Sequence, residues 1–76
     1  MRDLVVWLAQ QLVEDKAAVK VDAIERDRAT IFELTVAEDA LGRVIGRGGR
    51  TAMAMRTVLD IAGRRHGHRA VLDIVD

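Results

Sequence analysis

Three glycines within four residues constrain the fold of this 76-residue chain more than any other feature of its sequence. Gly46, Gly48 and Gly49 stand in the segment GRVIGRGGR, and an apolar pattern typical of helices lies on either side of them. Glycine adopts backbone angles that are closed to other residues, so the chain can reverse here between two helices. Because the loop lacks side chains, another backbone can also come close to it. The sequence therefore predicts two helices joined by a bare loop.

The glycine loop has the properties of an anion site. The first amides of the helix that follows have no partner within the helix, and the helix dipole makes that end positive. A phosphate group is the natural ligand of such an end. Arg43, Arg47 and Arg50 surround the glycines, and an arginine can hold a phosphate through two parallel hydrogen bonds. The loop is therefore predicted to bind phosphate.

Spacing decides between the known phosphate-binding loops. A P-loop requires GxxxxGK followed by Ser or Thr, which is absent. A dinucleotide-binding GxGxxG loop requires glycine at position 51, where Thr51 stands, and follows a strand instead of a helix. The pattern that fits is GxxG between two helices, preceded by Val44 and Ile45. GxxG loops of this kind clamp the backbone of single-stranded nucleic acid.

The charge distribution supports a phosphate-binding segment, although the net charge is zero. Residues 1–42 carry five basic and nine acidic side chains, whereas residues 43–69 carry seven arginines and the single acid Asp60. The basic segment is thus centred on the glycine loop and the helix that follows it. Charge alone is equally compatible with a solvated basic face that has no partner.

Composition limits the class of protein. A chain of this length has room for one domain with a modest core. The absence of Cys excludes disulfides and thiolate zinc sites, and LVVWLAQQLV is too short to span a membrane. No cleavable signal peptide is recognisable, so we expect a soluble cytoplasmic protein.

Hydrophobic periodicity predicts an α+β chain in the order α-β-β-α-α-β. A first helix is expected over residues 3–14 with Asp3 as its N-cap. Two antiparallel strands follow, with alternating apolar residues over 19–23 and 30–36 and a turn near 25–28. A short helix then ends at Gly46, a longer one runs over 50–63, and VLDIV (71–75) is a third strand.

The whole chain resembles a type II KH domain, and LGRVIGRGGRTAMAMRTVL resembles the matching segment of the small bacterial single-KH proteins of the KhpA family. The resemblance covers essentially all 76 residues. It implies a single KH domain over residues 1–76, with a three-stranded mixed sheet and helices packed on one face. Related loops often have a polar side chain at the second variable position, where this chain has Gly48, so less side-chain readout is implied.

The resemblance implies a cytoplasmic RNA-binding protein that acts on bacterial transcripts, as a post-transcriptional regulator or RNA chaperone. Such proteins often form a homodimer or pair with a larger KH protein, KhpB. The loop would hold about four nucleotides of single-stranded RNA, with bases in an aliphatic groove lined by side chains such as Val36. Ile45 also fits core packing, and Arg56 fits a phosphate contact or plain solvation. The candidate RNA-binding residues are Arg43, Val44, Ile45, Gly46, Arg47, Gly48, Gly49, Arg50 and Arg56.

Catalysis, metals and cofactors are not expected. The chain lacks Ser, Cys and Tyr, and neither histidine has an evident carboxylate and nucleophile partner. His66 and His68 have no evident third metal ligand. They belong to RRHGHR, about 20 Å along the helix from the loop, where arginines favour the helix dipole. Asp60 is expected to be a surface residue or an ion-pair partner.

A protein-interaction module with little RNA binding of its own is the alternative function. The helix over 50–64 has two apolar stripes, one of which contains Met55 and Leu59. Together the stripes make the apolar surface of the helix wider than packing against one small sheet requires. The second stripe fits either additional core or a homodimer surface. Its residues are Ala54, Val58 and Ile61.

Overall fold

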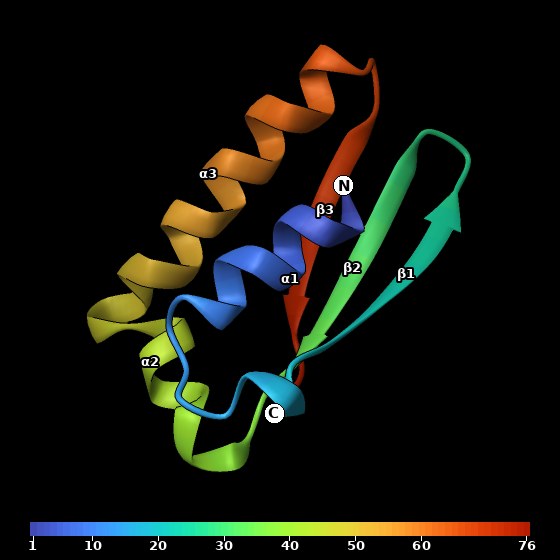
Figure 1. The fold of residues 1–76 in the computed structure, drawn as a ribbon. Coiled ribbons are helices and arrows are strands. Elements are labelled where there is room, and N and C mark those ends of the chain that lie inside the picture. The colour runs from blue at the N-terminus through green and yellow to red at the C-terminus, as the bar shows by residue number, and fades with distance from the viewer.

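The chain forms three α-helices and one three-stranded sheet in a computed structural model that describes all 76 residues (Figure 1). In chain order the elements are α1 (Arg2–Gln10), β1 (Lys20–Arg26), β2 (Ala29–Thr35), α2 (Leu41–Ile45), α3 (Arg50–Arg65) and β3 (Arg69–Ile74). Single 3-10 turns precede β1, α2 and α3. The predicted α+β class and its order of elements are confirmed. None of the helices is both long and apolar enough to cross a bilayer.

The sheet is mixed, as the resemblance implied. Its strand order is β1-β2-β3, with β1 antiparallel and β3 parallel to β2. A two-residue turn suffices for the antiparallel pair, whereas the parallel pair needs a crossover, which α2 and α3 provide. Of the two helices that carry the glycine loop, α3 packs along β3, and α2 packs against α3.

The core lies between the sheet and the helices. Alternate residues of β2 are buried, so Phe32 and Leu34 point toward the helices while Ile31 and Glu33 point the other way. α1 and α3 pack on the same side of the sheet (Figure 1). Leu59 of α3 is among the completely buried side chains. The buried core is mostly aliphatic, with Phe32 as its one aromatic residue.

The first helix is shorter than predicted. It runs over Arg2–Gln10, and its N-cap is Met1, with Asp3 in the first turn. The apolar pattern continues to Val13, which is buried although it follows the helix end. The periodicity predicted too long a helix because residues in a turn can fill the same core as residues in the helix.

The third helix continues past Gly63, where the sequence suggested its end. It runs to Arg65, and β3 spans Arg69–Ile74, shifted toward the N-terminus from the predicted 71–75. A Cβ atom at position 63 would collide with the backbone carbonyl of His68. This glycine is therefore explained by close packing of the end of α3 on the start of β3, and not by helix termination.

Candidate nucleic-acid interface

The glycine loop is a sharp bend between two separate helices. α2 ends at Ile45, and Gly46, Gly48 and Gly49 all have positive φ, at 76°, 64° and 77°. No residue other than glycine has a positive φ in the chain. Side chains rarely adopt such angles, because their Cβ atom comes too close to the backbone. The glycine cluster is therefore required by the backbone path.

The outer side of the loop is bare. A Cβ atom built on Gly48 or Gly49 would meet no other atom within 4 Å, whereas one on Gly46 would collide with Thr51. Gly46 thus lies against the first turn of α3, and the other two glycines face open space. Another chain can approach the peptide groups at this point.

The loop is positively charged, and all but one of its arginines lack an ion-pair partner within the chain. Arg47 and Arg50 are exposed and take part in none of the three ion pairs of the molecule. The N-cap of α3 is Gly49, so no side chain caps the first amides of this 16-residue helix. Free amides at a helix N-terminus attract anions. The arrangement is suited to a phosphate backbone.

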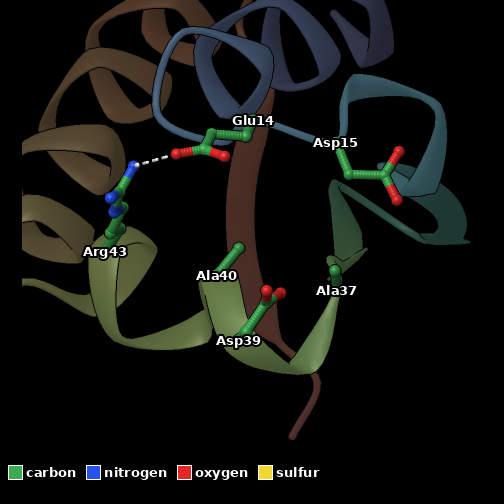
Figure 2. Close-up of a pocket in the computed structure, with 6 residues that line it drawn as sticks. All are labelled: Glu14, Asp15, Ala37, Asp39, Ala40 and Arg43. Atoms are coloured by element: carbon green, nitrogen blue, oxygen red, sulfur yellow. Dashed lines mark ion pairs between the residues drawn. The ribbon is translucent and has the colours of Figure 1, made fainter.

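Arg43 lies between the loop and an acidic cavity. Its Nη1 is 3.8 Å from Oε1 of Glu14, in the chain that follows α1 (Figure 2). The cavity has a volume of about 200 Å³, and Arg43 is its only basic residue, with Glu14, Asp15 and Asp39 as acidic ones. Because carboxylates repel phosphate, the cavity limits where a nucleic-acid backbone can run.

The two aliphatic residues before the loop have different environments. Val44 is 0% exposed, so it supports the loop from the core and offers no surface to a nucleotide, contrary to its predicted contact role. It is buried because it shares the core-facing side of α2. Ile45 is 36% exposed and is therefore available for contact instead of being core.

A depression that is half apolar lies near the start of α2 and contains a predicted floor residue. Its volume is about 560 Å³. Its apolar lining residues are Val36, Leu41 and Val75, and its polar ones are Thr35, Glu38 and Asp76. The sequence pointed to Val36 but missed the other two apolar residues, since Leu41 falls in the predicted short helix before Gly46 and Val75 at the end of the predicted third strand. The available signal was Val75 itself, an apolar and exposed residue one position after the end of β3.

Arg56 lies between α3 and the free edge of β3. Its Nε donates a hydrogen bond of 3.3 Å to the carbonyl oxygen of Leu72. One helix residue rises 1.5 Å, so Arg56 lies about 9 Å along α3 from Arg50. The structure therefore fixes its guanidinium beside the sheet edge, on the same helix as the loop.

The distal basic group is tied into the structure. Nη2 of Arg64 is 2.8 Å from Oδ2 of Asp60, so Asp60 is the ion-pair partner that its position suggested. Nε2 of His68 and Oγ1 of Thr30 are 2.7 Å apart. No group of three His, Cys, Asp or Glu side chains is arranged to hold a metal ion.

The two apolar stripes of α3 have different environments. Met55 and Leu59 are buried, whereas Val58 is 40% and Ile61 53% exposed. Ala54 is exposed too. Met53, at 63% exposure, extends the exposed surface and was missed by the sequence reasoning. The second stripe is therefore surface and not additional core.

Comparison with known proteins agrees with this geometry. The family model of the KhpA/KhpB KH domain matches residues 2–74. The RNA-binding protein KhpA of Aquifex aeolicus is 42% identical over 76 residues, which cover all of this chain and 96% of that protein. The proteins of the same name from Halalkalibacterium halodurans and Borreliella burgdorferi are 38% and 36% identical, over 100% and 97% of this chain and 100% and 90% of their own lengths.

These relatives are named as RNA-binding proteins, and the family is not one of enzymes. The family model covers nearly every element described above, including the loop between α2 and α3. The chain belongs to the KhpA family of small bacterial single-KH proteins.

Proposed function

We propose that this chain is a cytoplasmic RNA-binding protein, one KH domain over residues 1–76, that acts as a bacterial post-transcriptional regulator or RNA chaperone. The observation that carries the proposal is the bare loop surface at Gly48 and Gly49, flanked by the unpaired Arg47 and Arg50. The name of the relatives, RNA-binding protein KhpA, supports it.

The loop holds about four nucleotides of a single strand. Backbone amides of Arg47, Gly48 and Gly49 approach the phosphates, because no side chain of the two glycines keeps them away. The Gly49 amide already donates to the carbonyl oxygen of Gly46 at 3.0 Å, so direct donation to phosphate is assigned to Arg47 and Gly48. Arg47 and Arg50 supply paired hydrogen bonds. Arg43 contributes charge from α2, and Arg56 meets a phosphate further along α3.

The bases contact aliphatic side chains. Ile45 and the depression that contains Val36 provide this apolar surface. Aromatic stacking is not available there, since Phe32 is buried and Trp7, in α1, is the only other aromatic residue. Affinity is therefore modest, because stacking on aromatic rings provides much of the energy in many single-strand binders.

A loop variant with a matched control tests RNA binding. The variant carries Arg47→Asp and Gly48→Asp, and the control carries Arg65→Asp and Gly67→Asp. Gly48 and Gly67 both have φ of 64° and open space around them, so the two variants have the same charge change and place a side chain at the same positive φ.

The loop variant is expected to bind a fluorescently labelled single-stranded RNA at least about tenfold more weakly than the control, through charge repulsion and lost close approach. Fluorescence anisotropy measures the affinity, and circular dichroism checks the fold. Equal affinities for the two variants would contradict the loop assignment. If the parent chain shows no RNA binding at all, the protein-interaction module is the better description.

A homodimer through α3 is the second part of the proposal. Ala54, Val58 and Ile61 form the exposed stripe, with Met53 beside them. A second copy, or a larger KH-domain protein such as KhpB, would cover this surface. Ile61→Asp should shift sedimentation toward the monomer, whereas Asp60→Asn, at the neighbouring position, should not. A parent that is monomeric at high concentration rules out the homodimer.

A further inference from the structure

The face of the sheet that points away from the helices carries its side chains in rows. Strand pairing aligns Arg26, Ala29 and Arg69 across the three strands, and this set is the basic row. At the other end, the acidic row consists of Asp22, Glu33 and Asp73.

Between these rows lies an apolar row of half-buried residues, Ile24, Ile31 and Val71. It is two residues from the basic row and two from the acidic row on every strand. Strands rise about 3.3 Å per residue, so each charged row is about 6.6 Å from the apolar row. The face therefore has positive charge on one side of an apolar centre and negative charge at an equal distance on the other side.

The charges of this face have no ionic partners within one chain. None of the three ion pairs of the molecule includes a residue of either charged row. Arg26 donates only to the backbone carbonyl of its neighbour Glu25. Like charges directly opposite one another on adjacent strands are destabilising. The acidic row is thus a local repulsion in the isolated chain, and Lys20, two residues before Asp22 on the same face, forms no ion pair with it.

We infer that this face binds the same face of a second copy of the chain. A two-fold axis along the apolar row places the apolar residues of both copies against each other. The same axis sets the basic row of each copy against the acidic row of the other. Such an interface is isologous, and its equal row spacing meets the symmetry requirement. Arg26 and Arg69 of each copy then face Asp22 and Asp73 of the other copy, whereas Glu33 faces the uncharged Ala29.

The interface is small, which predicts weak association. Three strands about 4.8 Å apart give a face about 14 Å wide, well below the area of standard protein interfaces. A dissociation constant on the order of 100 µM is expected for such a contact. The face lies on the side of the sheet opposite to α1 and α3 (Figure 1), so the exposed stripe of α3 stays free.

A charge-exchange experiment tests the inference. One variant carries Arg26→Glu and Arg69→Glu, which makes the face acidic, and the other carries Asp22→Arg and Asp73→Arg, which makes it basic. All these positions are exposed. Every protein, including the parent, carries Ile61→Asp to remove association through α3. Sedimentation is measured at several times the expected dissociation constant, for each variant and for their equal mixture.

Each variant alone should associate at least about tenfold more weakly than the parent, and the mixture should form a complex at least as tight as the parent dimer. A monomeric parent, a variant that associates like the parent, or a mixture that stays monomeric overturns the inference. RNA affinity that changes with these variants while the association state does not would assign the face to RNA instead. If circular dichroism finds a double variant unfolded, the single changes Arg69→Glu and Asp73→Arg repeat the test.

Discussion

Arg43 differs from the other loop arginines because a carboxylate from a distant part of the chain competes for it. Glu14 is 3.8 Å from its guanidinium, and the side chains are 64% and 89% exposed. An ion pair this exposed contributes at most about 1 kcal/mol to folding, and often nothing measurable. Under the proposed RNA contact of Arg43, its effect is on binding, since it reduces the charge that Arg43 offers to RNA.

Glu14→Gln is expected to raise the affinity for single-stranded RNA about two- to threefold at low salt, because a repulsive charge beside the phosphate path is removed. The free energy of unfolding should change by less than about 0.5 kcal/mol. Fluorescence anisotropy and urea unfolding measure the two quantities. The control for net charge is Glu25→Gln. Glu25 is exposed and lies near the C-terminal end of β1, whereas Glu14 precedes the strand. An equal gain in both variants would attribute the effect to net charge alone.

At the scale of elements, two helical glycines show that helix propensity is secondary to packing. Gly42 in α2 has nothing near its missing Cβ, whereas Gly63 in α3 packs against the backbone of His68 and Ala70. Alanine favours an exposed helix over glycine by about 1 kcal/mol. The same substitution should therefore have opposite effects at the two positions.

Gly42→Ala is expected to stabilise the protein by about 0.5–1 kcal/mol. Gly63→Ala should destabilise it by at least about 2 kcal/mol, since α3 must move away from the start of β3 to admit the methyl group. Urea unfolding gives both values. Stabilisation by both substitutions would mean that the close contact of α3 with β3 is absent in solution.

The sequence predicted those elements whose pattern is local. Alternation identified β2, and the positive φ of Gly46, Gly48 and Gly49 follows from the bend that the glycines suggested. It did not predict that Val44 is buried, because the direction of one side chain in a five-residue helix depends on how that helix packs. The depression with Leu41 was missed because the residues that line it are far apart in the sequence.

At the scale of the whole molecule, the uneven distribution of charge matters more for nucleic-acid binding than the net charge of zero. Seven arginines lie in residues 43–69, while acidic residues dominate the remainder. Acidic side chains line the cavity beside Arg43 and form one row of the open sheet face. Under the proposed function, a phosphate chain is therefore expected to follow the loop and α3 and to be repelled by these acidic surfaces.

The salt dependence of RNA binding measures how many phosphates that region neutralises. Single-stranded nucleic acid gives a slope of log K against log salt of about −0.7 per neutralised phosphate. Contacts by Arg43, Arg47, Arg50 and Arg56 predict a slope near −2 to −3, or a loss of roughly 16- to 64-fold in affinity between 50 and 200 mM salt. Arg50→Gln should reduce the slope by about 0.7, whereas Arg65→Gln, at the far end of α3, should leave it unchanged. Equal effects of the two substitutions would show that net charge, and not a phosphate path along the loop and α3, determines binding.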